Sequence, residues 1–455
     1  MKQEVKFIEE NFSRFTGELK ELLRISSVST DSAYKNDIQN CAKWLKDHLE
    51  KIGLSKTEII QTGKHPIVYS EYVSNSSTPT ILIYGHYDVQ PPDPLELWKS
   101  DPFEPVIENN LIIARGAVDD KGQMFIILKA IETLLKTQGT LAFNVKLVLE
   151  GEEECGSVSL FDFIKNNKEK LKADIALACD TAMVSENIPA ITISLRGILY
   201  IELLVKTSDR DLHSGVYGGA ITNPLNVISD LMSKIKDDVG KVTIPGFYDD
   251  VVELDESEKA AISQIPFDEK EWLKLIGSTG TKTENGCSII EATTRRPSFD
   301  VHGIRGGYTG EGLKTVIPSE ASVKFSFRLA PNQKPEKILK GLQTYINNHI
   351  PGTVKYELRI LTKADPVLID KNNPYLRKAI DALEETFNTK AFLIGTGGSL
   401  PVVTSIKENL KIDTILMGFG LEEDGAHAPN ESFSLNRFKK GIESFTRFLD
   451  SQSLS

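Results

Sequence analysis

The sequence predicts an α/β protein, in which a three-layer domain with a mostly parallel sheet carries an inserted, smaller α+β sandwich. Three observations predict this. Short apolar runs alternate with helix-length amphipathic segments over residues 1–189. Near residue 190 the pattern changes to long, alternating strands, as expected for a sheet with one covered face. After about residue 366 the first pattern returns, which places the chain's two ends in one domain.

The elements of the first domain follow from their spacing. Apolar residues three and four apart predict helices, whereas short apolar runs bounded by polar residues predict buried strands. On this basis helices are expected over 5–24, 38–52 and 119–135, and strands over 67–72, 80–84, 145–150 and 174–179. In the returning segment a helix is expected over 373–386, a strand over 413–420 and a helix over 435–449.

The middle of the chain predicts the inserted sandwich. The run AITISLRGILYIELLVKT, beginning at Ala190, predicts one long strand because its apolar residues alternate. After it come predicted helices over 224–236, 253–265 and 335–350 and strands over 324–329 and 353–361. The predicted domains are therefore 1–189 with 366–455, and 190–365.

Composition excludes several classes of protein. The net charge of −11 is spread along the chain without a basic block, which argues against nucleic acid or an anionic membrane as a partner. The N-terminal stretch has no apolar core of a secretory signal, and no run of 18 apolar residues is present. Four scattered cysteines form no C-x-x-C pair, as is typical of reduced thiols in a cytoplasmic protein.

Acidic and histidine side chains follow five of the apolar runs. Singly, each motif is more often a surface histidine, a helix cap or a solvated acidic turn. Jointly they predict a metal site, because the carboxyl ends of parallel strands meet at one edge of a sheet. The residues in order are His86 and Asp88 in ILIYGHYD, Asp119 in GAVDDKGQ, Glu153 and Glu154 in EGEEECGS, Asp180 in DIALACD and His427 in DGAHAPNE.

The charge of this group favours two metal ions over one. Carboxylates that converge on one crevice repel each other unless cations offset them. Two divalent ions carry four positive charges, and three carboxylates with one hydroxide carry four negative charges.

At these residues the chain resembles the aminoacylase and carnosine-dipeptidase family of two-metal peptidases, and within it the cytosolic non-specific dipeptidases and their bacterial relatives. The motifs that carry the likeness occur in the family's order over nearly the whole chain: GHYDVQP, RGAVDDKGQ, EGEEECGS, ACD, DLHSGVYGGA, GGYTGEGLKTVIP, FSFRLAPN, GGSLPVV and DGAHAPNE. The resemblance implies that Asp119 bridges two ions, that His86 and Asp180 complete one, and that Glu154 and His427 complete the other. Zinc and manganese both suit such ligands.

The resemblance also implies an activity. Dipeptides, or short peptides with a free C-terminus, would be hydrolysed by a metal-bridging water that Glu153 activates, and Asp88 would support His86. The inserted domain would act as a lid and a dimerisation domain. From it His213 would reach across a homodimer interface to the oxyanion, while Thr315, Arg328 and, in the GGS turn, Ser399 would bind substrate.

Two other functions stay open. An N-acyl amino acid deacylase would use the same fold and the same metal chemistry. A catalytically silent scaffold would be expected to have lost a metal ligand or the general base. The five expected ligands and the expected base, Glu153, are all present.

Overall fold

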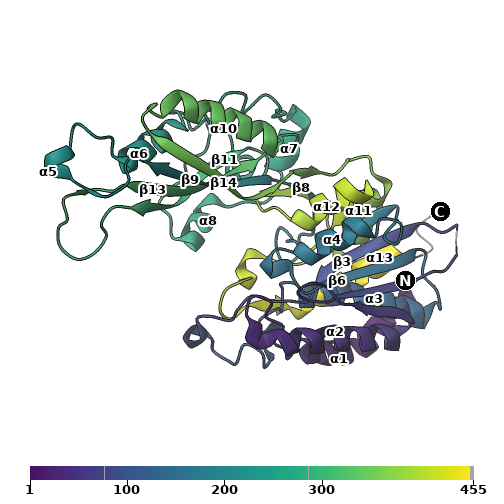
Figure 1. Ribbon diagram of the computed structural model, residues 1–455. Coiled ribbons are helices and arrows are strands. Elements are labelled where there is room, and N and C mark those ends of the chain that lie inside the picture. The colour runs from purple at the N-terminus through teal and green to yellow at the C-terminus, as the bar shows by residue number, and fades with distance from the viewer. Residues whose placement is uncertain (76, 285, 451–455) are drawn as a thin grey trace. The chain divides into compact units, whose positions relative to one another are not determined.

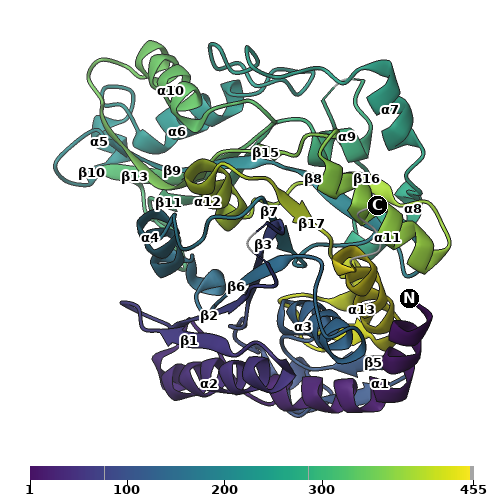
Figure 2. The same cartoon turned by 90° about the vertical axis from the view of Figure 1, so that its right-hand side faces the viewer.

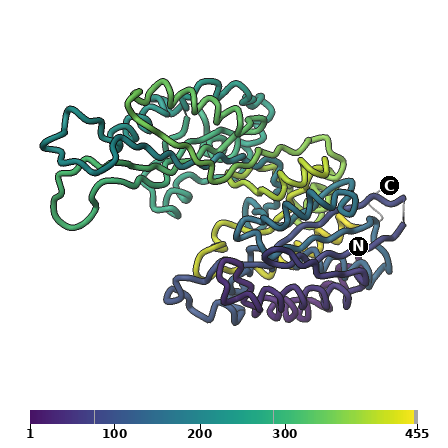
Figure 3. The backbone as a smooth tube through the Cα atoms, in the orientation of Figure 1, coloured from purple at the N-terminus to yellow at the C-terminus, as the bar shows by residue number. Residues whose placement is uncertain are grey.

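The computed structural model describes residues 1–75, 77–284 and 286–450. The chain divides into two compact units. The first unit comprises residues 1–193, 369–394 and 405–455, and the second comprises 194–368 and 395–404. Figure 3 shows both ends of the chain, purple and yellow, in one unit and the teal and green middle in the other.

A nine-stranded sheet lies mostly in the first unit (Figure 1), although its edge strand at residues 367–368 belongs to the second. Its middle strands β6, β3, β7 and β17 are parallel, and antiparallel pairs flank them. This confirms the predicted fold class. The strand order is β1 (Lys56–Ile60), β2 (Ile67–Tyr72), β6 (Asn144–Glu150), β3 (Thr80–His86), β7 (Ile175–Ala178), β17 (Thr414–Leu416), β8 (Ala190–Leu195) and β15 (Val367–Leu368), with β16 (Phe392–Thr396) paired to β8.

Helices cover this sheet on both faces. One face carries α1 (Lys2–Leu23), α2 (Lys35–Ile52), α3 (Lys121–Thr137) and α13 (Leu435–Leu449), and α4 (Val158–Asn166) lies on the opposite face (Figures 1 and 2). Helix α3 is buried on every side from Lys121 to Leu134, because α1 and α13 pack against it. Across this packing the Phe125 and Phe438 rings stack with centroids 6.4 Å apart. Within the described residues no helix has the length and apolar character needed to cross a membrane.

A small three-stranded sheet joins distant parts of the first unit. Strand β18 (Ser432–Ser434) pairs antiparallel with β5 (Leu111–Ile113), which pairs with β4 (Val106–Glu108). The loop before α13 is thereby fixed beside the segment that leads into α3. Helix α11 (Pro374–Phe387) completes the unit by packing on α13.

The second unit is a two-layer α+β structure. Its antiparallel sheet has the order β11 (Ser298–Gly306), β13 (Glu320–Leu329), β9 (Gly197–Lys206) and β14 (Lys355–Ala364). Alternate residues of β9 are buried, and they pack with α6 (Pro224–Lys234) and α10 (Pro335–His349) in one core. Shorter elements are β10 (Leu212–His213), β12 (Val316–Ile317), α5 (Ser214–Tyr217), α7 (Glu256–Ser263), α8 (Glu269–Ile276) and α9 (Ile289–Thr294).

Two expectations from the sequence are wrong in detail. The single strand expected from Ala190 is two strands in two sheets, β8 and β9, separated at Arg196. There the chain passes so close to its neighbours that a Cβ on Gly197 would meet the Ala364 carbonyl oxygen at 2.7 Å. Residues 395–404, expected in the first domain, belong to the second unit, where Arg196 Nε donates to the Gly397 carbonyl over 3.4 Å. This segment leads into α12 (Pro401–Leu410), which was not predicted.

Candidate metal centre

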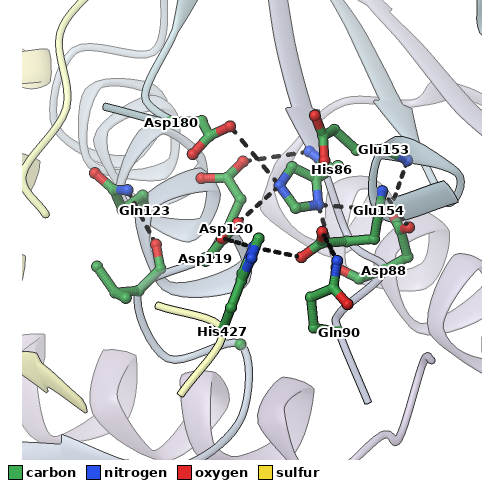
Figure 4. A network of polar contacts seen from close by, with 12 residues as sticks. His86, Asp88, Gln90, Asp119, Asp120, Gln123, Glu153, Glu154, Asp180 and His427 are labelled. Atoms are coloured by element: carbon green, nitrogen blue, oxygen red, sulfur yellow. Dashed lines mark hydrogen bonds and ion pairs between the residues drawn. The ribbon is translucent and has the colours of Figure 1, made fainter. Parts of the chain in front are cut away.

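Five predicted ligands come together beyond the carboxyl ends of the parallel strands (Figure 4). His86 is the last residue of β3, and Asp180 follows β7 by two positions. Asp119 lies just before α3, Glu154 lies in the 3-10 turn η3 (Glu153–Cys155) after β6, and His427 follows the turn η4 (Glu422–Asp424).

These side chains form two triads that share Asp119. In the first, His86 Nε2 lies 3.1 Å from Asp119 Oδ1 and 3.9 Å from Asp180 Oδ2. In the second, His427 Nε2 lies 2.8 Å from Asp119 Oδ2 and 3.3 Å from Glu154 Oε1. Within each triad the possible ligand atoms all lie within 4.8 Å of one another. The two oxygens of one carboxylate thus face two separate triads.

The donor atoms fit divalent ions. His86 Nε2 and Glu154 Oε1 are buried and make no hydrogen bond within the described residues, which is costly unless a ligand satisfies them. The other Glu154 oxygen, Oε2, accepts a hydrogen bond from Gln90 Nε2 at 2.6 Å. Imidazole nitrogens and carboxylate oxygens without a thiolate are the ligands that zinc and manganese accept.

The electrostatics of the triads reflect crowded carboxylates. Burial, together with the charge of Asp119, raises the pKa of Asp180 to about 7. The neighbouring carboxylates of Asp119 and Glu154 raise the pKa of His427 to about 10. Burial acts to raise the pKa of Asp119 as well, but the two imidazoles outweigh it and lower that pKa. Carboxylates placed in this way are stabilised by positive charge between them.

Asp88 supports the centre in two ways. His86 Nδ1 lies 3.1 Å from the backbone carbonyl of Asp88 and 3.5 Å from its carboxylate, so Nε2 is left facing the triad. The buried Asp88 carboxylate also accepts the backbone N–H groups of Glu153, at 3.2 Å, and Glu154, at 3.0 Å. One side chain therefore fixes both the histidine and the turn that carries Glu153.

Glu153 lies next to the triads, as Figure 4 shows. Burial raises its pKa, and the negative charges of Glu154 and Asp119 act in the same direction. A carboxylate with a raised pKa is a stronger base, and this suits a group that accepts a proton near neutral pH.

Three supporting residues were not predicted, although each lies in a motif that the sequence displays. Gln90 holds Glu154. Gln123 Oε1 accepts the N–H groups of Phe419 and Gly420, and its Nε2 donates to the Val118 carbonyl. Glu431 binds the segment before Asp119. Their common signal is a polar side chain within four residues of a predicted site residue in the same motif.

The other predicted site residues lie in the second unit, in two pairs. Strands β10 and β12 place His213 opposite Val316, and Ser214 donates its N–H to the Thr315 carbonyl at 3.0 Å. Arg328 Nη1 donates to Ser399 Oγ at 3.3 Å. His213 is exposed, and its Nδ1 accepts the N–H of Gly215, so the neutral ring carries its proton on Nε2.

A further triad of similar composition is already filled. Glu18, His48 and Glu132 are buried and close enough to hold an ion. Lys129 Nζ donates to all three, at 2.5, 2.9 and 2.8 Å respectively. Its ammonium group takes the position of a cation, so this triad is a structural cluster.

Comparison with known proteins places the chain among peptidases. The family model described as peptidase family M20/M25/M40 matches residues 82–451. The Cys-Gly metallodipeptidase of Schizosaccharomyces pombe is 30% identical over 97% of this chain and 96% of its own.

Two solved structures have similar folds. The M20 family metallo-carboxypeptidase Sso-CP2 from Sulfolobus solfataricus is 34% identical with a TM-score of 0.84, over 97% of this chain and 99% of that one. Human carnosine dipeptidase 1 is 26% identical with a TM-score of 0.82, over 100% of this chain and 99% of that one. With its two triads and a family match over most of its length, the chain belongs to peptidase family M20/M25/M40.

Proposed function

We propose that this protein hydrolyses the amide bond of dipeptides and short peptides with a free C-terminus, using two divalent ions, zinc or manganese. The observation that carries the proposal is the pair of triads that share Asp119. His86 and Asp180 would complete one ion, and Glu154 and His427 the other. The named dipeptidase relatives support a peptide as the substrate.

Within this proposal the chain's own residues move the protons. When bound, the ions would polarise the scissile carbonyl and lower the pKa of water at the centre. Glu153 takes a proton from that water and returns it to the leaving amine. Asp88 keeps Glu153 in place through the backbone N–H of that residue, and it holds the His86 ring at the same time.

Arg328 is the proposed anchor for the substrate's C-terminal carboxylate. No carboxylate lies within salt-bridge distance of its guanidinium in the described parts of the chain, and the burial that lowers its pKa also favours an anionic partner. Ser399, which accepts a hydrogen bond from Arg328, and Thr315 would add hydroxyl contacts. A guanidinium can bind a carboxylate with two parallel hydrogen bonds, which selects for a free C-terminus.

The protein is proposed to form a homodimer through the inserted domain. His213 of one subunit would then stabilise the oxyanion that forms from the substrate's carbonyl in the active site of the other. Its exposed ring offers an Nε2–H donor. Large apolar side chains are exposed in the same unit, including Val216 at 69% and Leu313 at 100%, as expected of a surface that another chain covers. All four cysteines are free, which supports a reducing, cytoplasmic location.

The test is a substrate panel on metal-stripped protein that is reloaded with Zn²⁺ or Mn²⁺. The panel contains Cys-Gly, β-Ala-His, other dipeptides, tripeptides, dipeptide amides and N-acetyl amino acids. Hydrolysis of dipeptides that returns only with metal is the expected result. Cleavage restricted to N-acyl amino acids would establish the deacylase instead, and a panel that stays intact with bound metal would indicate a silent scaffold.

A further inference from the structure

Glu431 is a fully buried carboxylate that belongs to neither triad but accepts a hydrogen bond from the backbone of their shared ligand, Asp119. It stands four residues after His427 and immediately before β18, with 0% of its surface exposed. Burying a charged group is unfavourable unless partners compensate it fully. The partners of Glu431 therefore indicate its role.

Four donors surround the carboxylate, two on each oxygen. Oε2 accepts Arg115 Nη1 at 2.7 Å and the Gly116 N–H at 2.9 Å. Oε1 accepts the Val118 N–H at 2.8 Å and the Asp119 N–H at 3.0 Å. The chain from Arg115 to Asp119 thus wraps around a single side chain.

The path of this segment depends on those contacts. Gly116 has a φ of +83°, and a Cβ there would meet Val89 Cγ1 at 2.7 Å, so the turn is both left-handed and tightly enclosed. The pairing of Ser432 with Ile113 and the bond from the Ala114 N–H to the Glu431 carbonyl fix the two strands side by side. The position of the Asp119 backbone is then set by the Glu431 carboxylate.

We propose that Glu431 is a positioning residue for the metal centre, holding Asp119 so that one oxygen of its carboxylate faces each imidazole. The same side chain joins the Asp119 segment to the loop that carries His427, and so it sets the distance between two ligands that belong to one triad. The inference deepens the proposed function and rests on the metal centre of that function, but not on the identity of the peptide.

The substitution Glu431→Gln tests this. Its amide keeps the shape of the side chain but presents an NH₂ group to two donors and leaves Arg115 without a carboxylate. We expect binding of Mn²⁺ or Zn²⁺ to the stripped protein, measured by calorimetry and by competition with a chelator, to weaken by about 10- to 100-fold for at least one ion. At saturating metal, kcat should fall more than KM rises, because the substituted residue does not contact substrate.

The matched control is Asp424→Asn. Asp424 is also buried and lies three residues from His427, but its carboxylate is bound by Arg437, at 2.5 Å, and by the Leu421 N–H instead of by residues 115–119. Its loss should lower the unfolding temperature as Glu431→Gln does, while metal affinity stays within about threefold of the wild type. If Glu431→Gln does not fold, Glu431→Asp serves, because it withdraws the oxygens from the N–H groups and keeps the charge.

The outcomes separate the possibilities. Folded Glu431→Gln or Glu431→Asp protein with wild-type metal affinity would overturn the positioning role, and so would an equal loss of metal affinity in Asp424→Asn. If the wild type binds two ions but cleaves no peptide, the proposed function fails, whereas the metal titrations still decide the role of Glu431.

Discussion

The proposed roles of Glu153 and its neighbour Glu154 differ because the two side chains have different surroundings. One Glu154 oxygen lies 3.3 Å from His427 Nε2 and the other accepts a hydrogen bond from Gln90, whereas neither of the two triads described above includes Glu153. Replacing Glu153 by Gln should therefore lower kcat by about 10²–10⁴-fold with little change in metal content. Steady-state kinetics and metal analysis on one preparation check this. Near-normal turnover in Glu153→Gln would assign the base elsewhere.

Arg328 gives a second test at the same scale. Arg328→Lys keeps the charge and loses the planar, two-point contact, so kcat/KM for a dipeptide should fall by about tenfold or more. The matched substrate is the dipeptide amide, which lacks the carboxylate and should be hydrolysed equally by both proteins. An equal loss on both substrates would place Arg328 outside the carboxylate site.

At the scale of elements, helix α3 depends on a glycine in its first turn. A Cβ on Gly122 would lie 1.9 Å from the Ala117 carbonyl oxygen, two residues before Asp119. Gly122→Ala should lower the free energy of unfolding by about 1–3 kcal/mol and weaken metal binding, because the chain at Ala117 must move. In α1, Gly17 has nothing within 4 Å of such a Cβ, so Gly17→Ala should stabilise the protein by about 0.5–1 kcal/mol. Denaturant titrations of both variants measure the contrast.

The cluster that joins α1, α2 and α3 predicts a loss of stability in acid. Burial and the neighbouring Lys129 lower the pKa of His48 to about 3. For Glu18, burial opposes ionisation, but the hydrogen bond from Lys129 outweighs it and lowers the pKa to about 2. The stabilisation of the folded state by neutral His48 is complete above pH 6.5, the ordinary pKa of histidine, and is lost as the pH falls from 6.5 towards 3. The stabilisation by ionised Glu18 is lost as the pH falls from 4.5 towards 2.

His48→Gln separates these contributions. Its amide oxygen can still accept from Lys129 but cannot titrate. The free energy of unfolding of the wild type should fall by up to about 1.4 kcal/mol for each unit that the pH is lowered from 6.5 to 4.5, and that of the variant should fall by less. Urea midpoints across that range are the measurement. Parallel curves for the two proteins would show that His48 does not govern the acid response.

How much could be predicted from the sequence also depends on the element. Helix α13 was expected at its observed bounds, because its apolar stripe is continuous and Ser434 caps it. The division of β8 from β9 was not predicted, because buried and alternating strands both read as apolar runs and only the tertiary contact at Gly197 separates them. The metal ligands lie in contiguous motifs, whereas the partners of Glu431 lie up to 316 residues away along the chain, and no local pattern records that contact.

For the whole molecule, the triads predict that metal supports folding as well as chemistry. Ions that bind only the folded state stabilise it, by about 2.7 kcal/mol when present at 100 times the dissociation constant. Chelation should thus lower the unfolding temperature by several degrees, and Zn²⁺ or Mn²⁺ should restore it. Asp119→Asn, which lacks the shared carboxylate, should show little response to either treatment. A chelator response of wild-type size in Asp119→Asn would mean that the stabilising ion binds elsewhere.

The first unit is assembled from both ends of the chain, and this has a consequence for synthesis. When the ribosome has made the first 400 residues, the nascent protein already carries His86, Asp119, Glu154 and Asp180. It still lacks β17, His427, the side chain that cradles Asp119, and the last helix. The hydrolytic centre can therefore form only after nearly all of the polypeptide has emerged. A translation product that stops before this point is expected to have no hydrolytic activity.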